Sequence, residues 1–354
     1  MSKIKIAIVG LGMGRFHVRG YLKHPSADVA AVVDLDESRF VEIKEMVPDV
    51  RTYTDFREML RAEKPDLVSV AVPNFLHEEI TCAALEAGAD VLCEKPMSLN
   101  VESALRMRDN AESTGRRLYI NFSQRFSEFA RTARDLVDEG RLGDIYHAYC
   151  QWTRRDGIPR FGGWFGQKKM SGGGPLIDLG VHRLDFVLWL MGAVKPLTVS
   201  GTTHHRLGTA LGKAQGKAFD VEDLASGFIR TDTGASILFE VSWTGFQVRK
   251  EQQALRLLGE KGSIEGGPGP HGDYTLHYCH DIAGHAFNSA LVQPGRETSS
   301  YEALIESLVT GKPYPSSAED GIRLQIVLDC LYESARLGRE VVVEEFAGTA
   351  LQYL

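Results

Sequence analysis

A chain of 354 residues, 43% hydrophobic and 25% charged, is long enough for two ordinary globular domains. Its net charge of −7 at pH 7 argues against nucleic acid and against an anionic membrane as partners, because both attract basic surfaces. No apolar run approaches the ~20 residues of a membrane span and no signal-peptide pattern precedes the first predicted strand, so we expect a cytoplasmic protein.

The first predicted strand, residues 4–9, runs into a glycine-rich turn and then a helix to about residue 24. A glycine turn between a first strand and a first helix is typical of dinucleotide sites, where helix N–H groups bind the pyrophosphate. The third glycine comes one residue early, with Arg15 at its usual position, and such turns can also be glycine-rich for steric reasons alone. The predicted contacts are Gly10, Gly12, Met13 and Gly14.

A second apolar strand, residues 28–33, ends at Asp34, which follows Gly14 by 20 residues. A carboxylate there would bind the ribose hydroxyls of a dinucleotide and repel a 2′-phosphate, which favours NAD over NADP. Alternatively, Asp34 only caps the next helix. Asp36 is close enough to share the role or to take it.

Strand–helix units then continue through strands 67–72, 90–93 and 117–122 and helices 55–63, 77–87 and 101–113. This alternation predicts an α/β fold with a doubly wound (Rossmann) parallel sheet in a nucleotide-binding domain of residues 1–123. Ligands of such sheets bind beyond the carboxyl ends of the strands. We therefore add to the cofactor-binding residues a set that follows those ends: Pro73, Asn74, His77, Glu94, Lys95 and Asn121.

Lys95 lies in the strand-end segment Glu94-Lys95-Pro96. Inside a cofactor cleft its ammonium could donate to a substrate oxygen and stabilise a developing alkoxide. The alternative is a surface lysine in a turn. The proline makes a cis peptide plausible, because X–Pro bonds carry only a small cis penalty.

The second half of the chain changes pattern. A linking helix over residues 128–139 precedes predicted strands 144–154, 197–203, 223–230, 235–243, 254–259 and 274–278, and Asp232-Thr233-Gly234 is a hairpin signal. We expect a C-terminal α+β domain of residues 124–354 with a large, open, mostly antiparallel sheet. A last helix, about 317–337, could pack back on the first domain. The outer face of the sheet is expected to build a homodimer or homotetramer.

The segment 171–192 contains three successive glycines, Pro175 and a helical apolar pattern. The glycines would let a ligand come close to the backbone. Asp178 and His182, four residues apart, would share one face near the start of the helix, as an acid/base pair would. The alternative is an aspartate that stabilises the helix dipole beside a structural histidine.

A loop before this helix contains Arg154, Arg155, Phe161 and Trp164, and guanidinium donors and ring faces suit a polyol. Its aromatic residues could instead only fill the domain junction. His285 could reach the substrate from a C-terminal loop. The remaining histidines match no standard zinc spacing, so we predict no metal site at His204, His205, His271, His277 and His280.

Taken together, the glycine turn, the EKP segment 94–96, GGG…DLGVH over 172–182 with Asp185 three residues on, and the closing block 311–343 resemble the glucose–fructose oxidoreductase/inositol dehydrogenase (Gfo/Idh/MocA) family. The resemblance implies a nicotinamide-dependent oxidoreductase acting on sugars, inositols or their derivatives. It also implies that Lys95, Asp178 and His182 are catalytic and that an arginine placed like Arg125 contacts substrate. The early third glycine departs from the family pattern and affects the pyrophosphate contacts.

We therefore expect NAD-dependent, reversible oxidation of a secondary hydroxyl of a sugar, glycoside or inositol, with 3-keto chemistry possible. His182 would be the general base, Lys95 would stabilise the substrate oxygen, and Asp178 would orient the base or hold a neighbouring hydroxyl. The expectation depends on the Lys95 ammonium and the His182 imidazole converging on one carbon. Two alternatives are an NAD-dependent glycosidase that uses transient oxidation and a non-catalytic dinucleotide-dependent sensor.

Overall fold

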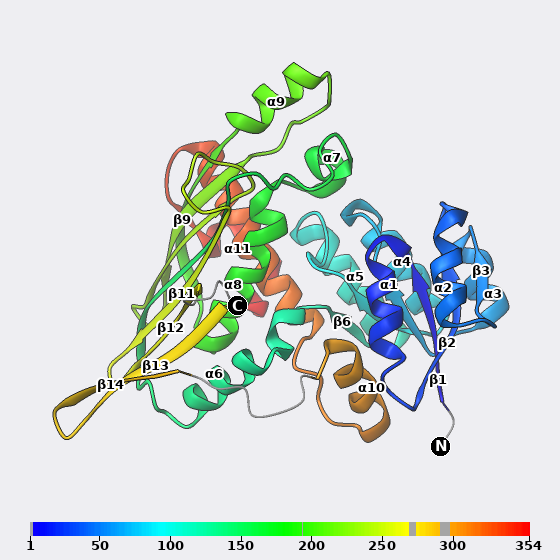
Figure 1. Ribbon diagram of the computed structural model, residues 1–354, viewed down its shortest axis with the longest axis horizontal. Helices are drawn as coiled ribbons and strands as arrows, with labels where there is room; N and C mark the ends of the chain where they lie inside the picture. The colour runs from blue at the N-terminus through cyan, green and yellow to red at the C-terminus, as the bar shows by residue number, and fades with distance from the viewer. Residues whose placement is uncertain (1–2, 193, 269–273, 291–297) are drawn as a thin grey trace. The chain divides into compact units, whose positions relative to one another are not determined.

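The computed structural model describes residues 3–192, 194–268, 274–290 and 298–354. The chain divides into two compact units, each with its own sheet (Figure 1). The first unit comprises Met1–Phe126 and Glu297–Gln325, and the second comprises Ser127–Arg296 and Ile326–Leu354. Within the described residues, no helix is both long enough and apolar enough to cross a membrane.

The first unit contains a six-stranded sheet in the order β3-β2-β1-β4-β5-β6, in which every pair is parallel. Its central strands β4 and β5 are buried along their whole length and are apolar except for Ser69 and Asp90, as expected for strands that helices cover on both faces. This order is that of a Rossmann fold, so the predicted α/β class is confirmed. The strands are β1 (Ile4–Val9), β2 (Ala27–Val33), β3 (Arg51–Tyr53), β4 (Leu67–Val70), β5 (Asp90–Cys93) and β6 (Leu118–Ile120).

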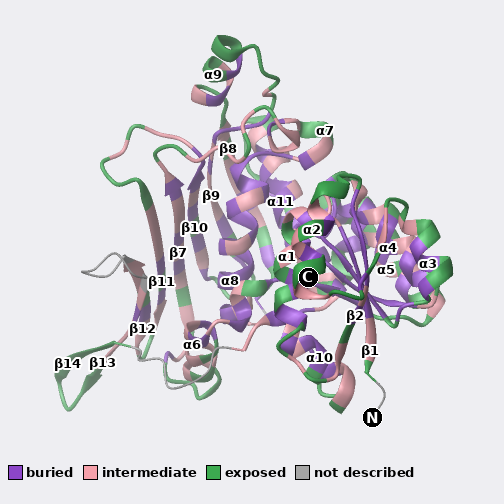
Figure 2. Cartoon of the chain, turned by 45° about the vertical axis from the view of Figure 1, so that its right-hand side comes forward, coloured by how far each residue is buried: buried purple, intermediate pink, exposed green. Residues whose placement is uncertain are grey.

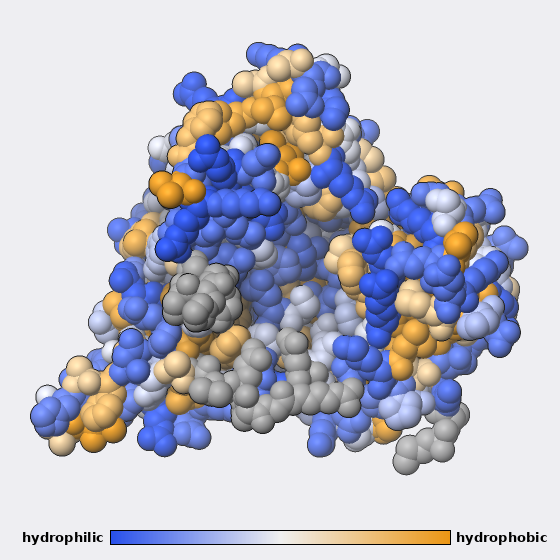
Figure 3. Space-filling model, in the orientation of Figure 1, coloured by the Kyte–Doolittle hydropathy of each residue, from blue (hydrophilic) through white to orange (hydrophobic). Residues whose placement is uncertain are grey.

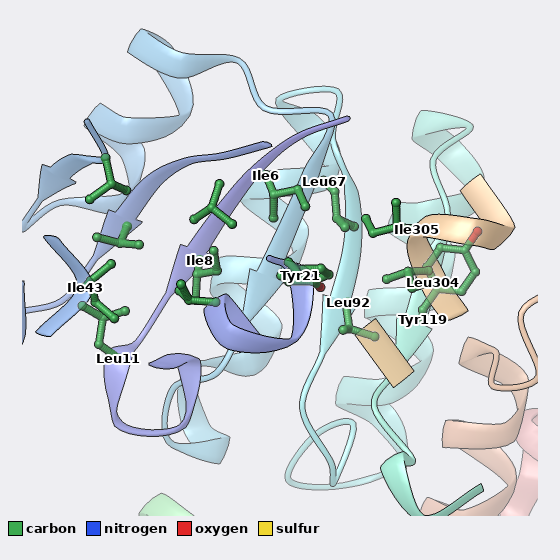
Figure 4. Close-up of a cluster of buried hydrophobic side chains, with 14 of the residues drawn as sticks. Ile6, Ile8, Leu11, Tyr21, Ile43, Leu67, Leu92, Tyr119, Leu304 and Ile305 are labelled. Carbon is green, nitrogen blue, oxygen red and sulfur yellow. The ribbon is translucent and has the colours of Figure 1, made fainter. Parts of the chain in front are cut away.

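Three of the α-helices of this unit begin after a residue whose side chain caps the helix N-terminus. Asp55 and Asn100 accept hydrogen bonds from backbone N–H groups of the helices they precede, and Ser299 forms a capping box with Glu302. Leu304 and Ile305, from the far end of the sequence, pack into the same core as Ile8 and Leu92 (Figure 4). The helices are α1 (Leu11–Tyr21), α2 (Phe40–Met46), α3 (Phe56–Glu63), α4 (His77–Glu86), α5 (Val101–Thr114) and α10 (Ser300–Thr310).

The second unit contains a nine-stranded sheet in the order β14-β13-β12-β11-β7-β10-β9-β8-β15. All pairs are antiparallel except β7 with β10, and the predicted hairpin joins β9 to β10. The expectation of a second, mostly antiparallel sheet is confirmed. The strands are β7 (Ile145–Arg154), β8 (Pro196–His204), β9 (Leu224–Thr231), β10 (Ser236–Ser242), β11 (Glu251–Gly259), β12 (Ser263–Pro268), β13 (Tyr274–Ile282), β14 (His285–Ala290) and β15 (Val341–Val342).

The two faces of this sheet differ. On β11, Leu255 and Leu257 are buried while Arg256 between them is exposed, as alternation along a strand dictates. Helices α8 and α11 lie on the buried side, and among the described residues no helix covers the opposite face (Figure 2). The helices are α6 (Glu128–Asp138), α7 (Lys168–Ser171), α8 (Val181–Met191), α9 (Leu207–Gln215) and α12 (Val343–Ala347), with α11 (Ala318–Leu337) divided between the units at Gln325.

Several elements were not predicted. The strands β3, β12 and β14 and the helices α2, α9 and α10 were missed, because they are short or lack a clear apolar period. Hydrophobic residues gather on the second unit close to α9 (Figure 3), where Leu211 is exposed. Because α9 is short and mostly exposed, its sequence shows little of the amphipathic periodicity from which a helix is predicted.

Candidate active site

The glycine turn after β1 has the geometry of a dinucleotide-binding turn. Gly10 has a φ of +90°, and a Cβ there would lie 2.6 Å from the carbonyl oxygen of Ala71. A Cβ on Gly14 would lie 2.7 Å from Cγ2 of Ile8. Gly14 thus permits the close approach of helix to strand that the third glycine of the usual fingerprint provides, although it comes one residue early.

Asp34 is held at the start of α1. Its Oδ2 accepts a 2.7 Å hydrogen bond from the Leu11 N–H, and Arg39 Nη1 lies 2.9 Å from the same oxygen. Asp36 instead accepts from the Ser38 hydroxyl and N–H, and this hydrogen bonding lowers its pKa. Of the two carboxylates, Asp34 is therefore the one positioned beside the helix N-terminus, where a ribose next to a bound pyrophosphate would lie. The residues present fit a dinucleotide.

The segments that follow β4 and β5 are joined by His77, which is fully buried. Its Nδ1 lies 2.9 Å from the carbonyl oxygen of Pro96 and its Nε2 lies 3.0 Å from that of Val72. Burial lowers the pKa of His77, although both carbonyls act in the opposite direction. The peptide bond between Lys95 and Pro96, for which the sequence made a cis form plausible, is cis. His77 thus braces the backbone next to Lys95, and Asn74 is buried in the same region.

Glu94 and Asn121, two of the predicted cofactor residues, contact each other. Asn121 Nδ2 donates to Glu94 Oε1 over 2.6 Å, and the buried His17 lies 2.9 Å from the same oxygen. Arg125 is also buried, and its Nη1 donates to the Pro315 carbonyl at 2.9 Å and to Asp320 at 3.0 Å. These bonds give Arg125 a structural role within the first unit.

In the second unit, the helix with Asp178 and His182 differs from the predicted regular one. A π-helical turn, Leu176–Gly180, precedes α8, so that Asp178 lies in the widened turn and His182 in the first turn of α8. Such turns occur frequently at functional sites. Asp178 Oδ2 accepts a 2.9 Å hydrogen bond from Nε1 of the buried Trp243, and the ring of His182 lies 5.9 Å from that of Trp152.

Two of the three glycines before this turn pack closely against protein atoms. A Cβ on Gly173 would lie 1.9 Å from the Tyr332 hydroxyl, and one on Gly174 would lie 2.0 Å from the Glu222 carbonyl oxygen. The Glu222 carboxylate accepts from the Leu176 N–H at 3.1 Å and from the Tyr332 hydroxyl at 2.8 Å. The expectation that the run serves ligand approach is therefore corrected for Gly173 and Gly174: they let the chain pack under the start of the helix.

The predicted substrate residues of the second unit are dispersed. Arg154 lies over the Trp152 ring and 3.4 Å from Glu251, whereas Arg155 donates to the Gln247 carbonyl. Trp164 stacks on Phe165 at 3.9 Å, and Phe165 meets the edge of Trp243. Arg154 and Trp164 are thus linked through aromatic rings to His182 and Asp178 respectively.

His285 begins the edge strand β14, and three strands separate it from β7, where Trp152 contacts His182. At about 5 Å per strand the two histidines lie far apart, so the structure does not bring His285 to His182. Of the other histidines considered for metal binding, His271 lies outside the described residues. Within the described part of the chain, no group of three or more His, Cys, Asp or Glu side chains is arranged to hold a metal ion.

Sequence reasoning missed the residues that hold the candidate groups in place. Trp243 and Glu222 lie 65 and 46 residues from their partners Asp178 and Leu176. His17 lies 77 residues from Glu94. The only sequence signal for them is a polar or amphipathic side chain at a position that strand or helix periodicity buries.

Known proteins match the chain along most of its length. Residues 4–122 match the model described as "Oxidoreductase family, NAD-binding Rossmann fold", and residues 130–265 match the "GFO/IDH/MocA C-terminal domain". A D-glucoside 3-dehydrogenase of Escherichia coli K12 is 32% identical over 96% of this chain and 97% of its own length. A myo-inositol 2-dehydrogenase of Thermotoga maritima is 25% identical over 98% of this chain and all of its own length.

Solved structures share the fold. An oxidoreductase domain protein from Kribbella flavida, 24% identical, superposes with a TM-score of 0.85 over 97% of this chain and 100% of its own. Levoglucosan dehydrogenase in complex with NADH and L-sorbose, 21% identical, gives 0.84 over 96% of this chain and 99% of its own. The two family-model matches and the full-length glucoside dehydrogenase relative show that this chain belongs to the Gfo/Idh/MocA family of oxidoreductases, whose first domain is an NAD-binding Rossmann fold.

Proposed function

We propose that the protein is an NAD-dependent dehydrogenase that oxidises a secondary hydroxyl of a sugar, glycoside or inositol, with a glucoside oxidised at carbon 3 as the first candidate. The observation that carries the proposal is 32% identity to D-glucoside 3-dehydrogenase along nearly the whole of both chains. Because inositol 2-dehydrogenases are among the relatives, we propose cyclitols as the second class of substrate.

NAD is proposed over NADP because Asp34 places a carboxylate, itself bonded to the Leu11 N–H, at the end of β2. A carboxylate there accepts hydrogen bonds from ribose hydroxyls and repels a 2′-phosphate. Gly10, Gly12, Met13 and Gly14 would surround the pyrophosphate. Pro73, Asn74 and the backbone that His77 braces would border the remainder of the coenzyme.

In the proposed reaction, bound NAD supplies the acceptor for the hydride that leaves the carbinol carbon. The imidazole of His182 accepts the hydroxyl proton, since its ordinary pKa lies near neutrality. Lys95 donates a hydrogen bond to the same oxygen and stabilises the negative charge that develops as the proton leaves. Asp178, with one carboxylate oxygen bonded to Trp243, orients His182 or a neighbouring hydroxyl. Arg154 and Trp164 are proposed to contact the sugar.

The test is a screen of the purified protein with NAD and NADP against glucosides, free sugars and inositols. A dehydrogenase gives stoichiometric absorbance of the reduced coenzyme. Release of aglycone without net NADH would establish the NAD-dependent glycosidase instead, and coenzyme binding with no turnover of any polyol would establish a sensor. Lys95, Asp178 and His182 argue against the sensor, because a binding protein needs no such set.

We also propose that the uncovered face of the nine-stranded sheet associates with a second copy of the chain. That face carries a groove of about 480 Å³ bordered by Tyr149, Arg256, Glu265 and His277. It presents charges of both signs beside exposed apolar side chains such as Leu238, which lets one copy of the face complement another. A monomeric mass in light scattering at micromolar concentration would contradict this assembly, whereas a dimer or tetramer is expected.

A further inference from the structure

A fully buried histidine on α1 connects the coenzyme helix to the strand end that bears Lys95. His17 lies in the second turn of α1, and its side chain has no exposed surface. Its Nδ1 lies 2.7 Å from the Ser69 hydroxyl on β4, and its Nε2 lies 2.9 Å from Glu94 Oε1 at the end of β5. A buried imidazole bonded at both nitrogens links three elements of the first unit at fixed distances.

One hydrogen bond of this network has a fixed direction, because the Glu94 carboxylate can only accept. The Nε2–H of His17 therefore donates to Glu94, while the Ser69 hydroxyl lies 3.1 Å from the Tyr21 hydroxyl and 2.7 Å from Nδ1 of His17. Serine, histidine and glutamate in series resemble a hydrolytic triad, but Ser69 is fully buried and already bonded to Tyr21, so no substrate could reach it.

Glu94 in turn contacts Lys95. Its Oε2 accepts from the Lys95 backbone N–H at 3.3 Å, while Oε1 accepts from Asn121 at 2.6 Å. Burial alone would raise the pKa of Glu94, but the His17 hydrogen bond, with the charges of His17 and Lys95, lowers it below the ordinary value. His17 therefore supports a carboxylate that is both next to Lys95 in the chain and bonded to its backbone.

We propose that His17 is a positioning residue for Lys95: through its Nε2–H bond it fixes the Glu94 carboxylate, and that carboxylate fixes the lysine. This inference rests on the proposed function for the importance of Lys95 in turnover. It assigns to a helix residue with no exposed surface a role in positioning the proposed catalytic lysine. The Ser69 bond, in contrast, only anchors the ring.

Two substitutions separate the two ring nitrogens. In His17→Gln the side-chain amide can reach the position of Nε2 and donate to Glu94. In His17→Asn it reaches only the position of Nδ1 and leaves Glu94 without that donor. We expect His17→Asn to lower kcat by about 10-fold or more, as loss of a hydrogen bond to a buried charge does, with KM and the Kd for NAD within about 3-fold of wild type. His17→Gln should recover most of that loss.

A second readout does not depend on turnover. Acetylation of Lys95 by limiting acetic anhydride, measured by mass spectrometry relative to the exposed Lys169, reports the state of the lysine itself. The ratio should change by about 3-fold or more in His17→Asn and remain closer to wild type in His17→Gln, because only the former leaves the carboxylate without its donor. Glu94→Gln, which removes the charge and keeps the side-chain shape, should change the ratio as His17→Asn does.

Equal acetylation ratios in wild type, His17→Asn and Glu94→Gln would overturn the positioning role, as would Gln and Asn variants that lose kcat alike. Circular dichroism establishes whether each variant is folded. If His17→Asn does not fold, the acetylation ratio of Glu94→Gln tests the positioning role in its place. A wild-type protein that oxidises no polyol would refute the proposed function alone. The acetylation ratios would still decide the positioning role in that case.

Discussion

The indole Nε1–H of Trp243 donates a 2.9 Å hydrogen bond to Oδ2 of Asp178. Trp243 has no exposed surface and directly follows β10, so the donor is fixed by the core of the second unit. Asp178 lies in the π-helical turn that precedes α8. The bond fixes the orientation of the Asp178 carboxylate, which lies in the turn that leads into the helix bearing His182.

Trp243→Phe removes that donor and keeps most of the buried ring. We expect kcat to fall by about 10-fold, because a hydrogen bond to a charged group contributes about 1.5–3 kcal/mol, while the Kd for NAD stays unchanged. Steady-state kinetics and coenzyme titration measure both quantities. Trp189→Phe, on α8 and eleven residues beyond Asp178 in the chain, controls for the loss of an indole. Equal turnover of the two variants would show that the bond does not orient Asp178.

Asp34→Ser removes the carboxylate at the end of β2, which is one of the two carboxylates paired with Arg39. The ratio of kcat/KM for NADP to that for NAD should rise by about 10-fold or more, since a repelling charge is lost and a guanidinium becomes able to bind a 2′-phosphate. Asp36→Ser is the matched control, because Arg39 also lies 3.3 Å from Asp36. A larger change in coenzyme preference in Asp36→Ser would assign the ribose to Asp36 instead.

Gly174→Ala should destabilise the second unit by about 2–3 kcal/mol or more. The new Cβ would lie 2.0 Å from the Glu222 carbonyl oxygen, a backbone atom that cannot move aside. Gly245→Ala is the control, since the nearest atom to its Cβ is 3.9 Å away, and it should leave the free energy of unfolding within about 0.5 kcal/mol. Urea denaturation compares the two; equal midpoints would refute the packing role of Gly174.

In the variant His77→Gln, the free energy of unfolding should fall less than in the wild type as the pH is lowered. Burial lowers the pKa of His77 below its ordinary 6.5, so at pH values between the two the unfolded chain binds a proton that the folded chain does not. The stability that the neutral histidine contributes is therefore complete above pH 6.5 and is lost as the pH falls below it. Between pH 7 and 5.5 the wild type should lose up to about 1 kcal/mol more than the variant, measured by urea denaturation. Parallel curves for the two proteins would show that His77 does not titrate in this window.

Much of the first unit could be predicted from its sequence because short, mostly apolar strands alternate regularly with helices. Residues 67–70 and 90–93 are buried along their whole length, as a central parallel strand requires. The three-residue strand β3 was missed because so short a segment contains no period to detect. The core contribution of α10 was missed because chain order does not reveal which distant helix packs against a sheet.

The candidate site shows a different limit. Local spacing singled out Asp178 and His182, yet a 3.6-residue period cannot reveal the π-helical turn between Pro175 and Val181. The partners that orient the candidate groups, Trp243 for Asp178 and His17 for Glu94, come from other elements and are fixed only by tertiary packing. Residues that act on the substrate can thus be proposed from motifs, whereas those that hold them require the fold.

The most direct test of the central claim is the absorbance of NADH formed when the protein meets NAD and an alkyl glucoside or an inositol, compared with its Lys95→Met and His182→Ala variants. The proposal predicts stoichiometric NADH from at least one of these substrates. It also predicts that each folded variant turns over about 100-fold more slowly or worse, since in the proposed reaction each removes a group that acts on the substrate hydroxyl. Near-normal turnover in either variant, or no NADH from any polyol with the wild type, would contradict it.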